Sequence, residues 1–220
     1  MASQLKRIEI LHEDDSCIVV NKPSGLAVQG GKGIGVSLDS ILAENWPQRP
    51  LLVHRLDRDT SGVVLVAKTK AAAAWFSRLF SMGSGVLKLY LAVCKGRPAV
   101  TEGEISHDLD IRGAVKKSLT HFRLLDVYAE GEFSMLELEL GTGRMHQIRR
   151  HLAFTGNPVL GDDKYGDFKL NRSLRKTMQL RRLLLHASRL VIPQTPDGAC
   201  LDISAPLPDH FNRCIEALQN

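Results

Sequence analysis

Residues 54–62 read HRLDRDTSG and lie between two apolar runs, LLV at 51–53 and VVLVA at 63–67. Five consecutive positions of this stretch include two arginines and two aspartates: Arg55, Asp57, Arg58 and Asp59. The apolar runs are typical of buried strands, so we expect the charges to lie on a turn between them. One interpretation is that the ion pairs serve only the turn, because Asp, Ser, Thr and Gly favour turns. The other is that the arginines keep one aspartate ionised in a partly dehydrated site, ready to act as a nucleophile or base.

The rest of the chain mixes helix and strand patterns and predicts an α+β fold. Apolar residues at helical spacing predict four helices, over residues 37–46, 69–83, 143–156 and 208–218. Short or alternating apolar runs separated by turn residues predict mainly antiparallel strands elsewhere, including 104–111. The polar and basic stretch 161–182 predicts a partly mobile loop or a short helix. We see no internal repeat and no linker, and we predict one compact domain over residues 1–220.

Length and composition argue against several classes of protein. The chain has 220 residues, of which 44% are hydrophobic, enough for a sizeable core. It has no uninterrupted apolar run of about 18 residues and no apolar signal-peptide segment near its start, so we expect neither a membrane partner nor secretion. The four cysteines are widely scattered without a C-x-x-C pair, which argues against structural zinc or a disulfide framework. We expect a reduced, cytoplasmic protein.

Positive charge is concentrated in one part of the chain. The net charge is +5, but residues 144–189 hold eleven Lys and Arg against three acids, a local balance of +8, which leaves −3 for the rest. Such a concentration attracts a polyanion such as RNA. A solvated basic surface without a partner is the alternative.

The stretch HRLDRDTSG resembles, almost letter for letter, the signature of the RluA-type pseudouridine synthases. Six other stretches resemble further motifs of that family, in the same order: NKPSGL (21–26), VVLVAKT (63–69), LKLYLAV (87–93), GTGRMHQIRRHL (141–152), GNPVLGDDKYG (156–166) and LLLHA (183–187). The resemblance implies a mixed, mostly antiparallel central sheet in two lobes with a catalytic cleft between them. It also implies an isomerase that converts uridine in RNA to pseudouridine without a metal or cofactor.

The resemblance assigns roles to four side chains. It implies that Asp57 is the catalytic carboxylate; whether Asp57 attacks the sugar, attacks the base or removes a ribose proton stays open. Arg55 matches the arginine that fills the space of the extruded uridine, since a guanidinium stacks on bases. Arg144 matches the arginine that pairs with the catalytic carboxylate. Tyr90 matches the tyrosine whose ring packs against the flipped base.

Further side chains are expected to contact RNA, and none is expected to bind a metal. The expected RNA contacts are Lys22, Lys88, His146, Arg149, Arg172, Arg175, Arg181 and Arg182. His146 and His151 are five positions apart, which places them roughly 140° apart on a helix, so one ion could not easily bind both. The Asp162–Asp163 pair reads as a turn, and GGKGIG (30–35) lacks the spacing and ending of a phosphate-binding loop. His54 is expected to orient the motif or touch a phosphate.

The nature of the RNA is the least constrained prediction. The stretch 9–31 and the full signature look closest to the branch that acts on large-subunit ribosomal RNA, and transfer RNA is the alternative. Many ribosomal members carry an N-terminal S4-like RNA-binding module, which we expect to be absent here, and we expect a monomer. Two other classes stay open: a metal-dependent nuclease using His54, Asp57 and Asp59, and a non-catalytic RNA-binding module. A pure binding module gives no reason for an acid between Arg55 and Arg58.

Overall fold

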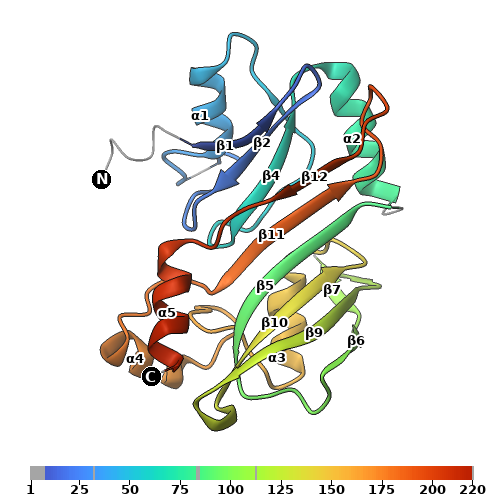
Figure 1. Ribbon diagram of the computed structural model, residues 1–220. Helices are drawn as coiled ribbons and strands as arrows, with labels where there is room; N and C mark the ends of the chain where they lie inside the picture. Colours follow the sequence, from blue (N-terminus) through green and yellow to red (C-terminus); the bar gives the residue numbers. More distant parts are fainter. Residues whose placement is uncertain (1–7, 32, 83–84, 112, 220) are drawn as a thin grey trace. The chain divides into compact units, whose positions relative to one another are not determined.

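The computed structural model describes residues 8–31, 33–82, 85–111 and 113–219 (Figure 1). Helices and mostly antiparallel strands are combined in it, which confirms the predicted α+β fold. The chain divides into two compact units, each made of two segments. Unit 1 comprises Met1–Lys88 and Ala187–Pro206, and unit 2 comprises Leu89–His186 and Leu207–Asn220.

Unit 1 is built on antiparallel strand pairs with two helices. Its elements are β1 (Glu9–Glu13), β2 (Cys17–Lys22), α1 (Leu38–Asn45), β3 (Leu51–Leu52), β4 (Ser61–Ala67), α2 (Lys70–Met82), β12 (Leu201–Ser204) and most of β11 (Leu185–Ile192). Strand β2 pairs with both β1 and β4, β3 also pairs with β4, and β12 pairs with β11. The hydroxyl of Ser37 caps α1, which confirms the predicted start of that helix.

The core of unit 1 explains the apolar runs around the charged stretch. Every residue of β4 is buried, as are the first four residues of β2. Strands covered on both faces need continuous apolar sequence rather than alternation. On one face Val19 and Leu65 pack with Phe76 of α2 in a single hydrophobic cluster. The charged stretch therefore enters directly into a rigid, buried strand.

Gly62, the last residue of HRLDRDTSG, is required by a close backbone approach. Its φ of +110° is a conformation that side chains with a Cβ rarely adopt. A Cβ at this position would lie 2.1 Å from the carbonyl oxygen of Ala187. Only glycine therefore allows β4 to begin here beside the backbone of β11.

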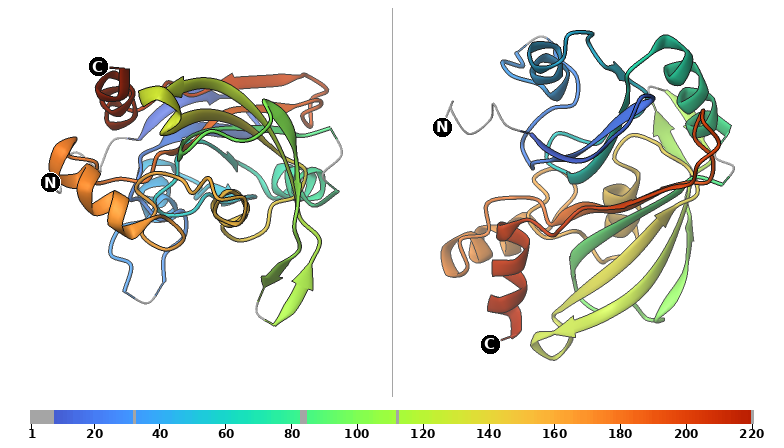
Figure 2. Two further views of the ribbon diagram at one scale, coloured as in Figure 1. Left: turned by 90° about the horizontal axis from the view of Figure 1, so that it is seen from below. Right: turned by 45° about the horizontal axis from the view of Figure 1, so that its top comes forward.

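Unit 2 contains a second sheet region and three helices. Its elements are most of β5 (Leu87–Lys95), β6 (Glu102–Ser106), β7 (Leu109–Ile111), β8 (Ala114–Lys116), β9 (Leu119–Tyr128), a short 3-10 helix (Ala129–Gly131), β10 (Phe133–Leu140), α3 (Gln147–Phe154), α4 (Phe168–Thr177) and α5 (Asp209–Gln219). Four strands pair antiparallel in the order β5–β10–β9–β6. Strands β7 and β8 form a separate hairpin that extends away from the other strands (Figure 2, left). Val93, Leu184 and Phe211 belong to its main hydrophobic cluster.

The helices and strands differ from the predicted ones in two places. The helix predicted over 143–156 begins only at Gln147, because His146 has a φ of +54°, which a right-handed helix does not accommodate. The single strand predicted over 104–111 is divided between β6 and β7, which pair with different strands. The stretch 161–182 contains α4, the short helix of the two alternatives. The predicted end of α2 at Gly83 lies outside the described residues.

Within the described ranges, no helix combines the length and the apolar character that crossing a membrane would need.

Candidate active site

The charged stretch forms the loop between β3 and β4 of unit 1. Its apolar residue Leu56 is buried, and Thr60 is buried where the loop joins β4. The guanidinium groups of Arg55 and Arg58 are exposed, and Asp57 is half-buried. The loop is therefore anchored by its uncharged residues, and its charged side chains lie at or near the surface.

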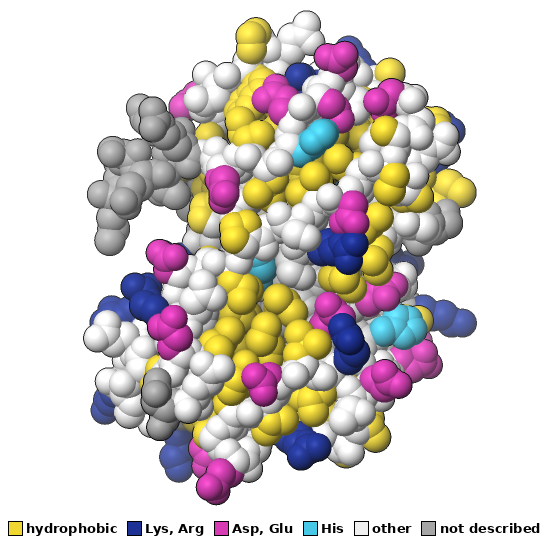
Figure 3. All heavy atoms as spheres, in the orientation of Figure 1, with side chains coloured by type: hydrophobic (Ala, Val, Ile, Leu, Met, Phe, Trp, Pro, Cys, Tyr) yellow, Lys and Arg dark blue, Asp and Glu magenta, His cyan; other side chains and the backbone are white. Residues whose placement is uncertain are grey.

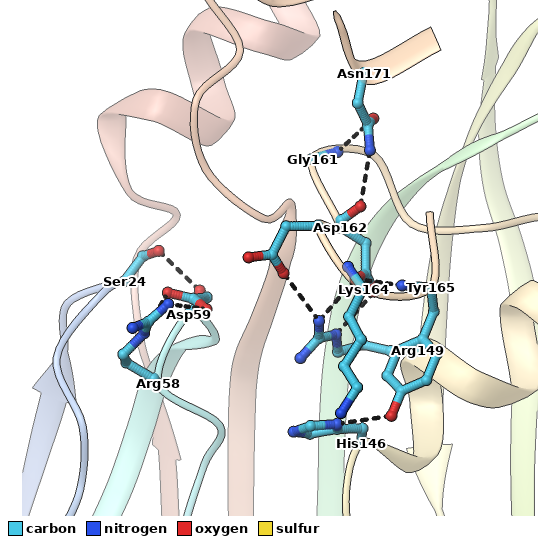
Figure 4. Close-up of polar contacts among 11 residues, drawn as sticks. Ser24, Arg58, Asp59, His146, Arg149, Gly161, Asp162, Lys164, Tyr165 and Asn171 are labelled. Carbon is cyan, nitrogen blue, oxygen red and sulfur yellow. Dashed lines mark hydrogen bonds and ion pairs between the residues drawn. The ribbon is translucent and has the colours of Figure 1, made fainter. Parts of the chain in front are cut away.

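The stretch 21–25, NKPSG, fixes the backbone of this loop with three hydrogen bonds. The ammonium of Lys22 and the backbone N–H of Gly25 both donate to the carbonyl of Arg58, at 3.0 and 2.9 Å. The hydroxyl of Ser24 donates to the carbonyl of Asp59 at 2.7 Å (Figure 4). The side chain of Asp59 pairs with Arg58 at 3.1 Å. The two motifs, more than 30 residues apart in sequence, thus form one rigid assembly around Asp57.

Lys22 is a structural part of this assembly rather than the surface RNA contact suggested by the sequence. Its side chain is fully buried, and its ammonium also donates to the carbonyls of Pro23 and Leu26, at 3.0 and 2.8 Å. Burial lowers the pKa of Lys22 to about 7, although Asp59 and Asp57 oppose this shift. An ammonium surrounded by three carbonyls inside the protein is not available to a phosphate.

This burial predicts a pH-dependent stability. Between pH 7 and about 10 the unfolded chain keeps a proton on Lys22 that the folded protein has lost, so the free energy of unfolding rises with pH by about 1.4 kcal/mol per unit. Below pH 7 both states are protonated and the slope vanishes. Lys22→Met removes this titration. Urea unfolding at pH 6, 8 and 9 should therefore show a difference between wild type and Lys22→Met that grows above pH 7.

The exposed Lys70→Met variant serves as the control and should follow the wild type at every pH. Parallel pH profiles for wild type and Lys22→Met would show that the lysine keeps its ordinary pKa in the fold.

His54 anchors the start of the loop to β4. Its Nε2 accepts a hydrogen bond from the backbone N–H of Leu65 at 2.9 Å, and its ring stacks on Phe80 of α2 with centroids 4.4 Å apart. Burial, together with the charge of Lys88, lowers the pKa of His54 to about 3. The imidazole is therefore neutral and acts as an acceptor, which supports its predicted role in orienting the motif. Lys88 itself is half-buried, and burial lowers its pKa.

Unit 2 carries the other two residues expected to act in catalysis. Tyr90 lies on β5 opposite Leu138 of β10, and its side chain is buried. Arg144 lies in the turn before α3, is exposed, and donates from Nε to the carbonyl of Lys117 at 3.3 Å.

Gln147 builds this turn, a role that the sequence did not suggest. Its side-chain oxygen accepts from the backbone N–H of Arg144 at 3.0 Å and from the hydroxyl of Thr142 at 2.7 Å. Its side-chain nitrogen donates to the carbonyl of Leu119 and to the hydroxyl of Thr120, at 2.8 and 3.0 Å. A single buried amide thus joins the start of α3 to β9 and fixes the backbone that carries Arg144.

Arg149 and Asp162 form a buried ion pair in unit 2 (Figure 4). The guanidinium contacts both carboxylate oxygens, at 2.8 and 2.7 Å, and the two side chains are 4% and 1% exposed. The carboxylate also accepts the backbone N–H groups of Lys164 and Tyr165, at 2.9 and 3.0 Å. These donors outweigh burial and lower the pKa of Asp162. Arg149 is therefore engaged inside the unit and is not the exposed RNA contact that the sequence suggested.

The turn GDDKYG extends this network to His146. The guanidinium of Arg149 lies 5.3 Å from the ring centre of Tyr165, and the hydroxyl of Tyr165 hydrogen-bonds Nδ1 of His146 at 3.0 Å. Asn171 of α4 accepts from the N–H of Gly161 and donates to the carbonyl of Asp162. The sequence indicated a turn at Asp162 but not its ion pair with Arg149. The one signal in the sequence is the aspartate itself, because an aspartate in a turn often accepts hydrogen bonds from the backbone N–H groups that follow it.

The remaining predicted RNA contacts, Arg172, Arg175, Arg181 and Arg182, are exposed on α4 and on the loop after it. Dark-blue side chains gather over α4 and α5 at the lower left of Figure 3. This placement is compatible with their predicted role.

One group of possible metal ligands lies close together among the described residues: His12, Asp14 and Cys17 in the β1–β2 turn. Their hydrogen bonds account for the group. His12 Nε2 lies 2.9 Å from one Asp14 oxygen, and the other oxygen accepts the N–H groups of Ser16 and Cys17. Burial raises the pKa of Cys17 to about 12, which disfavours the thiolate that a metal would need.

Comparison with known proteins places this architecture in a family. Residues 16–154, more than half of the chain and including the whole charged loop, match the family described as RNA pseudouridylate synthase. The chain belongs to the RNA pseudouridylate synthase family.

Relatives and solved structures of pseudouridylate synthases extend over nearly the whole chain. Two proteins named ribosomal large subunit pseudouridine synthase C are 34% identical (Rickettsia bellii) and 36% identical (Escherichia coli K12). The first alignment covers 97% of this chain and 73% of that protein, and the second 96% and 70%. The structure of human RNA pseudouridylate synthase domain containing 4 has a TM-score of 0.80 at 27% identity, covering 99% and 95% of the two chains. Domain containing 1 gives 0.77 at 29%, covering 97% and 95%.

The predicted site residues of this pseudouridylate synthase are divided between its two units. Unit 1 brings Arg55 and Asp57 together on the loop held by NKPSG. Unit 2 carries Tyr90, Arg144 and His146 together with the Arg149–Asp162 pair.

Proposed function

We propose that the protein converts uridine to pseudouridine in large-subunit ribosomal RNA. The observation that carries the proposal is the loop at Asp57, fixed by NKPSG, in a chain that matches ribosomal large subunit pseudouridine synthases over 96–97% of its length. In the reaction the C1′–N1 bond of uridine breaks, the uracil turns, and C5 bonds to C1′. The proton leaves C5 and N1 gains one, so that substrate and product are isomers.

The proposal gives Asp57 the role of the catalytic carboxylate. The half-burial of Asp57 and the rigid backbone around it support this role, because a carboxylate held in a fixed position is ready to act as a nucleophile or base. Exposed Arg55, two residues earlier, is proposed to fill the space of the extruded uridine. Tyr90 is proposed to pack against the flipped base. Arg144 is proposed to act in catalysis together with Asp57 and Tyr90.

The test is to map pseudouridine in defined RNAs. Purified protein is incubated with unmodified large-subunit ribosomal RNA or with transfer RNA, with and without EDTA. Carbodiimide adducts, which stop reverse transcriptase at pseudouridine, then locate the product. We expect stops at one or a few uridines of the ribosomal RNA, an intact strand and no effect of EDTA.

Each alternative class gives a different result. Metal-dependent cleavage would indicate a nuclease, and tight binding without conversion would indicate a binding module. Conversion in transfer RNA alone would contradict the proposed target.

We further propose that the protein works as a monomer, without a metal, in the cytoplasm.

A further inference from the structure

Unit 2 contains a pocket that none of the proposed catalytic roles uses. Its volume is about 480 Å³, and it lies between the chain that follows α4 and the first turns of α5. Nine residues line it, and its polar and apolar walls include Met178, Leu180, Arg181, Arg182, His210 and Arg213. The volume is in the range of pockets for small organic ligands, far more than a bare ion needs.

The polar wall of the pocket is strongly positive. Arg181, Arg182 and Arg213 contribute three guanidinium groups, all on exposed residues. Among the interactions of the described residues, no carboxylate is paired with Arg181 or Arg213. Guanidinium groups that line one pocket repel one another, and an anion between them relieves that repulsion.

His210 adds a buried atom that lacks a partner. Its ring hydrogen-bonds the backbone of Leu183, but its Nε2 is buried with no hydrogen-bond partner among the described atoms. Leaving such an atom unsatisfied is costly, and native proteins rarely do so without a ligand or water. The arginine cluster and the side chain of His210 line the same pocket.

We propose that this pocket binds one nucleotide of the substrate RNA through its phosphate, an inference that rests on the proposed function. Arg181, Arg182 and Arg213 contact the phosphate oxygens, for which the planar guanidinium is well suited. Met178 and Leu180 offer an apolar surface to the ribose or base. Four further basic side chains are exposed on α4, the helix that precedes the pocket segment: Lys169, Arg172, Arg175 and Lys176.

The proposal also predicts proton uptake. Burial, together with the charges of Arg182 and Arg213, lowers the pKa of His210, and the hydrogen bond with the Leu183 backbone and the charge of Asp209 oppose this shift. A bound phosphate offsets the arginine charges and favours the protonated form of His210. Binding to the wild type should therefore become tighter as the pH falls. His210→Gln should lose this dependence.

The test compares two double variants with the same change in charge. Arg181→Ala with Arg213→Ala removes two guanidinium groups from the pocket. Arg97→Ala with Arg123→Ala removes two exposed arginines elsewhere in unit 2. Filter binding is measured between 50 and 200 mM salt with the ribosomal RNA fragment that contains the target uridine. We expect the pocket variant to bind the RNA about tenfold more weakly at 100 mM salt. The slope of the logarithm of the binding constant against the logarithm of the salt concentration should become shallower by about 1 to 2.

The control variant should stay within about twofold of the wild type, because Arg97 and Arg123 do not line the pocket and exposed charges are screened by salt. An affinity and a salt slope equal to those of the control would overturn the inference, as would an unchanged pH dependence in His210→Gln. Calorimetry with uridine monophosphate and with inorganic phosphate separates the sources of the ligand. Tight binding of a free nucleotide, with RNA affinity independent of the pocket, would make it a metabolite site and also overturn the inference.

Failure of the proposed function would look different. In that case the wild type itself would neither bind nor modify ribosomal RNA. Where the wild type does both and the two double variants behave alike, only the inference about the pocket fails.

Discussion

Asp57→Asn is expected to lower the rate of pseudouridine formation by on the order of 10³-fold or more, with RNA affinity changed little. The amide has nearly the same size as the carboxylate, but it carries no charge and is neither a nucleophile nor a base. Removal of a group that acts in the chemical step gives losses of about this order. RNA labelled with tritium at C5 of uridine gives the rate directly, because the label is released when C5 bonds to C1′.

The loop contains its own control, Asp59→Asn. Both substitutions remove one negative charge, and the two residues are two positions apart in the sequence. The side chain of Asp59 pairs with Arg58, which is 63% exposed, whereas the contact from Ser24 goes to the backbone of Asp59 and survives the substitution. We therefore expect less than about a tenfold loss for Asp59→Asn, since exposed ion pairs contribute little. Equal losses in both variants, or an active Asp57→Asn, would remove Asp57 from the proposed mechanism.

Asp162→Asn is expected to lower the free energy of unfolding by about 3–5 kcal/mol, the cost of leaving one member of a buried ion pair without its partner. Arg149 and Asp162 are almost fully buried and contact each other through two hydrogen bonds, whereas the other acid beside Arg149, Asp163, is 72% exposed and lies at a longer distance of 3.5 Å. Urea unfolding followed by circular dichroism measures the loss.

The exposed pair of Arg123 and Glu137 in the same unit provides the matched control. Its N···O distance of 2.8 Å is nearly the same, yet Arg123 is 60% exposed. Glu137→Gln should therefore cost less than about 1 kcal/mol. Similar losses for the two variants would show that burial does not decide the strength of the Arg149–Asp162 pair.

The same pair predicts an acid sensitivity. The pKa of Asp162 is lowered in the folded protein, so its stabilising contribution is present above about pH 4. That contribution is lost as the pH falls through the lower pKa of the folded state. Asp162→Asn should therefore flatten the pH dependence of stability in acid.

Local patterns in the sequence were sufficient for much of the fold and for the position of the charged loop. The continuous apolar runs predicted the buried strands β2 and β4, and Ser37 predicted the start of α1. Such features depend on contacts within a few residues along the chain, which is why periodicity and capping rules detect them. The residue types and spacing in HRLDRDTSG likewise depend on local turn chemistry.

The roles of single charged side chains were decided by the tertiary structure. Lys22 appears in the sequence as one more basic residue, but the chain returns at Arg58 and surrounds its ammonium with carbonyls. Asp162 is thirteen residues from Arg149, and only the fold buries the two together. Arg182 and Arg213 come from distant segments that line one pocket. The free energy of a charged side chain depends on its burial and on its hydrogen-bond and ion-pair partners. Both are set by the three-dimensional path of the chain and cannot be read from the local sequence pattern.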